Sequence, residues 1–413
     1  MKKYIEKTVD KDFNQACILV FLSLYISFET LLFGSNADAR FGTALQYLYL
    51  LGALFCFCGL LKRISRFQEL IKLLLLLLSM IVLTAVVNLD FSGGYILQMC
   101  TMIIGCYLCA RFSLDTFIKA FEKVIFLIAC SSLIIYIIYL LMPQAFGLFP
   151  TLYNNSDYSY KFIVVSQFIE NEFLVRNMAF FREPGVYVIF LVFALVVNLF
   201  YFTKPRRSHT LIIIISILTS LSTAGILLMS GTLFLYLISK RSWGGFIGLF
   251  LLSVVVFLVL SFGNETDFYL RTIDKLNPES SYYGSTTART SSIVVPLNML
   301  LYNPITGVGV SNFGDLYKTI SKSIYHVEIS SEGEATNTLF NLMATYGLLY
   351  GLLLIMYLKR FSSKLSKKNN ALIRLIVFCL LSLALFNEDI RYTIPLFLFI
   401  FYGAKKNNIS MQF

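Results

Sequence analysis

Two arginines and a glutamate precede an apolar segment in the middle of the chain, where they could bind phosphate and move a proton. Arg176, Arg182 and Glu183 come before Pro184 and Gly185, which open that segment as the start of a helix. Guanidinium groups hold phosphate through several donors at once, and a carboxylate can receive or position a hydroxyl proton. In a second interpretation without a ligand, Glu183 complements the positive end of the helix and the arginines lie at a membrane interface.

A second polar region begins with Arg289, on a predicted amphipathic helix over residues 286–302 that Pro296 interrupts. We expect this helix to lie on the membrane or on a helical bundle. Asn303 ends it, and Gly307 and Gly309 then allow the backbone to approach a ligand or a neighbouring helix. The predicted apolar face consists of Ile293, Val294, Leu297, Leu300 and Leu301.

Three further residues before the next apolar segment could contact a substrate. They are His326, Glu334 and Asn337. A lone histidine in a loop is more often a solvated polar residue than a catalyst, so the role of His326 depends on its surroundings.

Two other groups of charged residues stand close to apolar segments. Glu388, Asp389 and Arg391 occupy a short turn, where mutual ion pairing is the simplest interpretation. Glu29 is unusual because it falls within the first apolar run, and we expect its carboxylate near the outer interface.

The elements that must position these residues are membrane helices. The chain is 57% hydrophobic with a mean hydropathy of +0.75, and runs of about 18 or more apolar residues recur along it. We therefore predict an all-α, polytopic transmembrane helical bundle with about 12 spans. The predicted spans are residues 16–34, 42–61, 70–88, 94–112, 123–142, 185–203, 210–222, 223–239, 244–263, 337–358, 371–387 and 390–404.

Residues 210–239 are too long for one upright span and short for two. Basic residues flank both ends, so both ends belong on the same side, and Ser220 to Gly225 become the turn of a short hairpin. A re-entrant or broken pair of helices fits the sequence equally well.

Lysine and arginine are concentrated in the N-terminal segment, in alternate loops and in the C-terminal tail, which predicts that both termini are cytoplasmic. Residues 1–413 then form a single polytopic membrane domain, whose two large loops, 143–184 and 264–336, face outward and contain short helices. The net charge of +11 is a topological signal rather than the mark of a nucleic-acid partner.

All eight cysteines lie in or beside apolar segments and none lies in either large loop. This placement indicates neither a disulfide framework nor a metal site. We expect no cofactor.

The order of these motifs resembles that of bacterial O-antigen and capsular polysaccharide repeat-unit polymerases of the Wzy type, which are related to O-antigen ligases. The motifs are Arg-Glu-Pro-Gly at 182–185, Ser-Thr-Ala-Gly at 222–225, Arg289, and Asn-Pro-x-x-Gly-x-Gly at 303–309. The similarity runs from about Leu174 to Gly351. One departure is Thr336 before Asn337, where relatives of the ligases often have histidine.

The resemblance implies a metal-independent glycosyltransferase of the bacterial cytoplasmic (inner) membrane. Its substrates would be undecaprenyl-pyrophosphate-linked glycans, which would enter from the lipid bilayer through a lateral opening of the protein and reach an outward cavity. A chain-length regulator is a further candidate partner. Arg176, Arg289 and Arg182 would contact the pyrophosphate and Glu183 would be the base, with Glu334 or His326 as substitutes.

Two alternatives remain: an O-antigen ligase, and a flippase or secondary transporter of lipid-linked oligosaccharides. The sequence does not determine the sugars, the linkage formed, O-antigen versus capsule, the organism or the oligomeric state.

Overall fold

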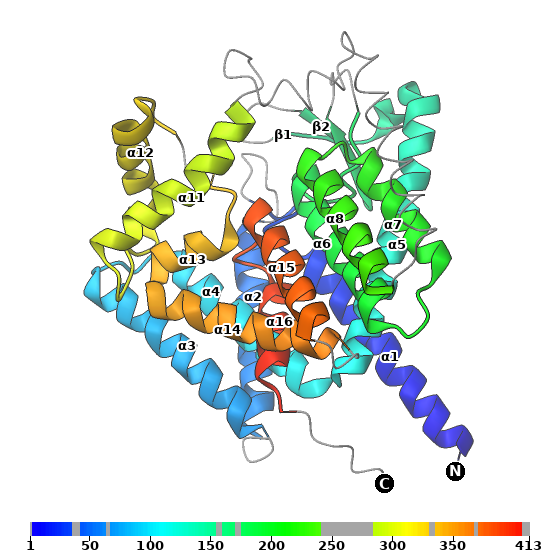
Figure 1. The fold of residues 1–413 in the computed structure, drawn as a ribbon, viewed down its shortest axis with the longest axis horizontal. Helices are drawn as coiled ribbons and strands as arrows, with labels where there is room; N and C mark the ends of the chain where they lie inside the picture. The colour runs from blue at the N-terminus through cyan, green and yellow to red at the C-terminus, as the bar shows by residue number, and fades with distance from the viewer. Residues whose placement is uncertain are drawn as a thin grey trace.

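The computed structural model describes residues 2–34, 42–62, 67–153, 159–169, 175–240, 284–329, 335–366 and 371–406, which are mainly helical (Figure 1). This agrees with the predicted helical membrane class. The helices are α1 (Lys2–Tyr25), α2 (Gly42–Leu61), α3 (Gln68–Val87), α4 (Gly93–Arg111), α5 (Leu114–Leu141), α6 (Pro184–Val196), α7 (Arg207–Thr219), α8 (Thr223–Lys240), α11 (Gly284–Tyr302), α12 (Ser311–Tyr325), α13 (Thr338–Tyr346), α14 (Leu348–Leu365), α15 (Ala371–Asn387) and α16 (Ile394–Ala404).

Six helices of the described part are long and apolar enough to cross a membrane: α2, α3, α4, α5, α6 with its π-helical extension η3 (Val197–Tyr201), and α8. The predicted span 244–263 lies outside the described residues. The first predicted span ends earlier than expected, at Tyr25, and the tenth is broken at Gly347. Gly347 adopts a φ of +92°, which an α-helix cannot contain. The structure therefore supports a multi-pass protein without giving twelve spans.

The centre of the bundle is α6, whose side chains are almost all buried. Its sequence is apolar all round, and a helix of that kind is stable when other helices cover every face. α5, α7, α8 and α15 pack around it. On the other side of the molecule, α4 packs against α2, α3 and α16. These contacts hold the first residues of α4 and α6 in fixed positions at one end of the bundle.

Residues 210–239 are divided into two helices, α7 and α8, that pack against each other, as both the predicted hairpin and the alternative broken pair require. The turn between them contains Leu221 with a φ of +50°, and the Ser220 hydroxyl donates to the carbonyl of Ile217 at 2.6 Å. Gly225 lies against Val188 of α6, which explains why a small residue follows the turn.

The first large loop differs from the prediction of short helices. Its described residues form a short 3-10 helix, η2 (Pro143–Leu148), and an antiparallel sheet of β1 (Thr151–Tyr153), β2 (Ser159–Ile163) and β3 (Ser166–Ile169) in the order β1-β2-β3. Alternate residues Tyr160 and Phe162 of β2 are buried with Leu31 and Met178. Side chains two residues apart point to the same face of a strand, so Tyr160 and Phe162 together cover the loop that follows α1.

The second large loop contains α11 and α12, and most of the predicted apolar face of α11 is not the face that packs on the neighbouring helices. Val295 and Met299 are buried against α12, whereas Ile293, Leu297 and Leu301 are exposed. Pro296 lies inside a continuous helix instead of ending it. The buried stripe is set by α12 and α13, which pack on α11, and the exposed leucines leave a second apolar face.

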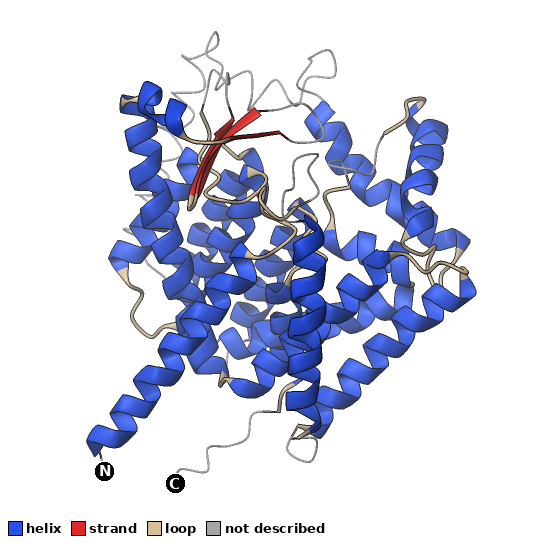
Figure 2. Ribbon diagram, turned by 180° about the vertical axis from the view of Figure 1, so that it is seen from behind, coloured by secondary structure: helices blue, strands red, loops and turns tan. Residues whose placement is uncertain are grey.

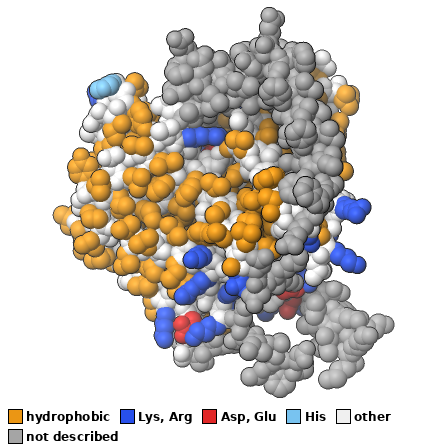
Figure 3. All heavy atoms as spheres, in the orientation of Figure 1, with side chains coloured by type: hydrophobic (Ala, Val, Ile, Leu, Met, Phe, Trp, Pro, Cys, Tyr) orange, Lys and Arg blue, Asp and Glu red, His pale blue; other side chains and the backbone are white. Residues whose placement is uncertain are grey.

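The first residues of α1 and the last residues of α16 lie at one end of the bundle, and the sheet lies at the opposite end (Figures 1 and 2). Hydrophobic side chains cover much of the described surface between the two ends (Figure 3). The described parts of the two large loops, with the sheet, α11 and α12, thus lie at the end away from the first residues of α1.

Candidate functional site

A cavity of about 500 Å³ at the loop end of the bundle gathers charged side chains from distant parts of the chain. Its charged lining comes from three segments: the residues after α1, the residues before α6, and the turn between α15 and α16. The charged lining residues are Glu29, Arg182, Asp389 and Arg391. Ser311 and Thr336 add hydroxyl groups from the starts of α12 and α13.

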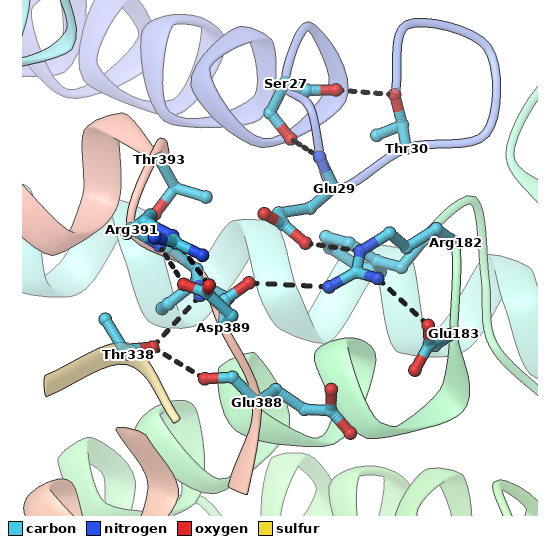
Figure 4. Close-up of polar contacts among 12 residues, drawn as sticks. Ser27, Glu29, Thr30, Arg182, Glu183, Thr338, Glu388, Asp389, Arg391 and Thr393 are labelled. Carbon is cyan, nitrogen blue, oxygen red and sulfur yellow. Dashed lines mark hydrogen bonds and ion pairs between the residues drawn. The ribbon is translucent and has the colours of Figure 1, made fainter. Parts of the chain in front are cut away.

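Arg182 joins the three segments through its guanidinium group (Figure 4). Its Nε lies 2.8 Å from Glu29 Oε2 and its Nη1 lies 2.9 Å from Glu183 Oε1, while Nη2 donates to the carbonyl of Asp389 at 3.5 Å. The Arg182 backbone N–H also donates to the carbonyl of Glu29 at 2.8 Å. Burial lowers the pKa of Arg182, but Glu29 and Glu183 oppose this and hold it above its usual range. The group is therefore a fixed cation.

Glu29 is a buried carboxylate at the wall of the cavity. Burial raises the pKa of Glu29, and the neighbouring Arg182 opposes that rise. Arg182 contacts Oε2 only, and no contact in the described part of the chain involves Oε1. One oxygen is thus held in place and the other is available to a ligand.

Arg391 is the second arginine of the cavity, and Asp389 lies between it and Arg182 in Figure 4. Its Nε lies 2.7 Å from Asp389 Oδ2, and its Nη1 donates to Thr345 Oγ1 at 3.4 Å. The guanidinium carbon lies 4.8 Å from the centre of the Phe313 ring. Burial lowers the pKa of Arg391, but Asp389 raises it, and the result lies above its usual value. Within the described part of the chain these contacts use Nε and Nη1 and leave Nη2 for a ligand.

Hydrogen bonds to α13 fix the turn that carries Asp389 and Arg391. The Thr338 hydroxyl donates to the carbonyl of Glu388 at 2.6 Å and accepts from the N–H of Ile390 at 3.0 Å. Asn341 Nδ2 donates to Asp389 Oδ2 at 2.9 Å. A single threonine at the first position of α13 therefore sets the backbone of the turn.

Glu388 points away from the cavity and its carboxyl group fills the space beside Gly185, in the first turn of α6. A Cβ at position 185 would overlap Glu388 Oε1, so the glycine of the Pro-Gly pair makes room for this carboxyl. Burial raises the pKa of Glu388 well above its usual value; Glu183 raises it further, and the charges of Arg182 and Arg289 oppose the rise. We therefore expect Glu388 to be a neutral acid next to the charged cluster.

The glycines of the second loop are used for packing. Gly307 and Gly309 have φ values of +69° and +85°. The N–H of Gly309 donates to the carbonyl of Thr345 at 3.2 Å, and the N–H of Leu348 donates to the carbonyl of Pro304 at 2.9 Å. This segment therefore docks on the break between α13 and α14.

Asp90 fixes the start of α12 beside the cavity. Its carboxylate accepts from the backbone N–H and the hydroxyl of Ser311, at 2.7 Å and 2.6 Å, and from the Tyr95 hydroxyl at 3.0 Å. Burial raises the pKa of Asp90, but the hydrogen bonds from Ser311 outweigh it and the pKa is lowered. The hydroxyl of the lining residue Ser311 therefore has a defined position.

The structure brings some of the predicted site residues together. Arg182 lines the cavity, and Glu183 is bound to it while its side chain remains 39% exposed. Arg289 is half-buried on α11, and its charge acts on Glu388. Asn337 is buried as the N-cap of α13, where Oδ1 accepts from the N–H of Phe340 at 3.0 Å.

Other predicted residues lie elsewhere. Arg176 does not line the cavity; its neighbour Asn177 binds the C-terminal end of α7, where the Asn177 N–H donates to the carbonyl of Thr219 at 2.9 Å. His326 is exposed at the C-terminal end of α12 with a φ of +59°. Glu334 lies outside the described residues, and Gly307 and Gly309 do not line the cavity.

The sequence prediction did not include Glu29, Asp389 and Arg391 among the site residues. Each carried a signal, because a carboxylate within an apolar run and a charged turn between two spans are both unusual in a membrane protein. Simple ion pairing explained the turn equally well. Only the packing of the turn beside Arg182 brings these residues into one site.

Residues 208–356 match a protein-family model described as O-antigen ligase. The matched stretch includes Arg289, Gly307, Gly309 and Asn337, and it begins after Arg182 and ends before Asp389. No curated protein matches the chain. The match supports a function in glycan assembly of the ligase or polymerase type, and it does not distinguish these two.

Proposed function

We propose that the protein is a polymerase that joins undecaprenyl-pyrophosphate-linked oligosaccharide repeat units into O-antigen or capsular polysaccharide at the outer face of the bacterial cytoplasmic membrane. A hydroxyl oxygen of the incoming unit attacks the anomeric carbon of the growing chain. The bond from that carbon to the pyrophosphate oxygen breaks, and undecaprenyl pyrophosphate leaves with the electron pair. The hydroxyl proton passes to a carboxylate of the protein.

The observation that supports this proposal best is the pair of arginines at one cavity. Arg182 and Arg391 line the same cavity. Glu29 holds the guanidinium group of Arg182 in place, and Asp389 holds that of Arg391. A pyrophosphate gains negative charge as it leaves, and donors that are already positioned stabilise that charge without reorganising. Guanidinium groups suit a phosphate because they offer several donors in one plane.

Glu29 is better placed than Glu183 to be the base. Glu29 lines the cavity and one of its oxygens makes no contact in the described part of the chain, whereas Glu183 does not line the cavity. Burial also raises the pKa of Glu29, and a base is most effective when its pKa lies near the working pH. Asp389 is a weaker candidate because Arg391 and Asn341 both donate to Oδ2.

Arg289 of α11 is a third candidate for contact with the pyrophosphate. Its charge reaches Glu388 behind the cavity, and it lies within the stretch that matches the O-antigen ligase family. Arg289 does not line the cavity, and we propose that it contacts the pyrophosphate from α11, beside the lining residue Arg182, as the resemblance implied. Arg176 and His326 lie outside the cavity lining, so their predicted roles would need contacts with parts of the substrate beyond the reacting bond.

The test is to incubate the purified protein in vesicles with its lipid-linked repeat unit and to separate the products by gel electrophoresis. A ladder of multiples of the unit, lost in Arg391→Ala and in Arg182→Ala, is expected. Arg176→Ala is the matched control for an arginine outside the cavity lining. Absence of a ladder in the wild type, with transport of the intact unit across the vesicle, would establish a transporter instead.

An O-antigen ligase is the second candidate, because the matching family model carries that description. A ligase transfers a finished chain once to a different lipid acceptor. Adding such an acceptor to the assay separates the two enzymes: a ligase gives a single product on the acceptor and no ladder without it.

The proposed orientation can be tested apart from the chemistry. Reporter fusions after Ser281 are expected to report the outer compartment, because α11 and α12, which follow it, lie at the end of the bundle away from the first residues of α1. A cytoplasmic signal there would place the cavity on the wrong side for lipid-linked repeat units.

A further inference from the structure

A basic pocket lies at the ends of α15 and α16 that are opposite the turn with Asp389 and Arg391, and so at the other end of the bundle from the cavity. Its volume is about 590 Å³, and the ends of α14, α15 and α16 line it. Five cationic side chains contribute: Arg360, Lys364, Arg374, Lys405 and Lys406. Among the described residues, no acidic side chain lines this pocket. Figure 3 shows lysine and arginine side chains gathered below the hydrophobic surface at this end.

Two of the cations are held in place by the backbone of neighbouring helices. Lys364 Nζ donates to the carbonyls of Tyr402 and Lys405. Lys405 Nζ donates to the carbonyls of Cys109 and Phe112, at 2.7 Å and 2.9 Å. Carbonyl groups orient an ammonium group but carry no net charge, so these hydrogen bonds do not neutralise Lys364 or Lys405.

The other cations include two side chains that remain more open to a ligand. Arg360 stacks on the ring of Tyr357, with 5.1 Å between the guanidinium carbon and the ring centre. Lys406 pairs with Glu69 at 3.5 Å, but its side chain is 75% exposed. A ligand can therefore reach both groups without disturbing the helix ends.

One face of α14 leads from apolar surface directly into this pocket. Leu349, Leu352 and Met356 are exposed, and they follow one another at three- and four-residue spacing. The same spacing continues to Arg360 and Ser363, which line the pocket. Side chains at this spacing share one side of a helix. A molecule lying along α14 would thus meet hydrocarbon surface first and positive charge next.

We propose that this pocket binds the phosphate headgroup of an anionic phospholipid, whose acyl chain lies along the apolar stripe of α14. The lipid would belong to the leaflet on the side of the termini. Clusters of basic residues between membrane helices attract anionic headgroups. This site is separate from the glycan cavity and does not depend on the proposed enzymatic function.

The test measures the affinity of the purified full-length protein for fluorescent phosphatidylglycerol in a zwitterionic detergent. Each cation near a headgroup contributes about a fivefold change in affinity. We expect Arg360→Ala and Lys406→Ala each to weaken binding by about fivefold, and the double variant by about 25-fold if the two act independently. Arg360→Lys keeps the charge and should bind close to the wild-type level.

Lys359→Ala is the matched control, because Lys359 is an exposed cation on the same helix that does not line the pocket. It should leave the affinity unchanged. An equal loss in Lys359→Ala, or equal binding of phosphatidylcholine, would overturn the proposal in favour of a general surface charge. Full displacement by excess inorganic phosphate would identify free phosphate as the ligand instead. Since no glycan is present, the result is independent of the polymerase assay.

Discussion

Replacing Arg182 by alanine should destabilise the protein in a way that depends on pH. In the wild type the guanidinium lies 2.8 Å from Glu29, whose side chain is only 6% exposed. The substitution leaves this carboxylate buried beside the cavity without its counter-ion. Removing one partner of a buried ion pair typically costs about 3–5 kcal/mol.

Protonation limits the part of this cost that comes from Glu29. A carboxyl with an ordinary pKa of about 4.3 can take up a proton at pH 7 for about 3.7 kcal/mol, so the electrostatic loss cannot exceed that value. At pH 5 the same limit falls to about 1 kcal/mol. Without Arg182 the folded-state pKa of Glu29 should lie further above its unfolded value. The loss of unfolding free energy relative to the wild type should therefore grow as the pH rises from about 4.3 towards that folded pKa.

The assay is the free energy of unfolding in mixed micelles of a mild detergent and dodecyl sulfate, measured between pH 5 and pH 7. The double variant Arg182→Ala with Glu29→Gln removes both charges, so it should recover most of the loss at pH 7 and lose the pH dependence. Glycan transfer should stay absent in both variants, because the phosphate-binding cation is gone.

A loss of stability that is equal at pH 5 and pH 7 would refute the electrostatic reasoning. It would show that the packing of the arginine side chain, and not its charge, stabilises the junction of the three segments. Recovery of activity in the double variant would remove Arg182 from the proposed site.

Three further predictions concern the surroundings of Arg182. Gly185→Ala should destabilise the protein by about 1–3 kcal/mol, because the new methyl group overlaps the carboxyl of Glu388, and adding Glu388→Ala should relieve that loss; unfolding measurements on both variants check this. Glu29→Gln should lower the rate of glycan transfer by about 10²–10⁴-fold in single-turnover assays if Glu29 is the base, and a smaller effect than that of Glu183→Gln would reassign the role. Arg289→Lys should lower transfer by about 10–100-fold while the protein stays inserted, because a lysine keeps the charge and loses the paired donors; near-normal polymer would exclude a phosphate contact.

The residues of the first loop show how far local sequence reasoning reaches. Pro184 and Gly185 predicted the start of α6, and the structure begins that helix at Pro184. The sequence also singled out Arg182 and Glu183, which proved to be paired. The reason for the glycine was not available from the sequence, because the carboxyl group that fills its place belongs to Glu388.

The second loop shows what pattern reasoning leaves open. The sequence predicted Ile293, Leu297 and Leu301 as part of an apolar face of α11 that lies on the membrane or on the bundle, but Val295 and Met299 are the residues buried by neighbouring helices. Hydrophobic periodicity gives the spacing of a face and not the identity of its partner. α11 offers two apolar faces, and α12 and α13 cover only one of them.

The sequence by itself determined the class of the protein, the ends of several helices and the existence of two large polar loops. These features follow from short-range properties: the hydrocarbon content of about 20 consecutive residues, and the backbone limits of proline and glycine. The tertiary structure decided which charges meet. Glu29 and Arg182 are 153 residues apart, and Arg182 and Asp389 are 207 apart. No local period connects such positions, so only the packing of α1, α6, α13 and α16 brings them to one cavity.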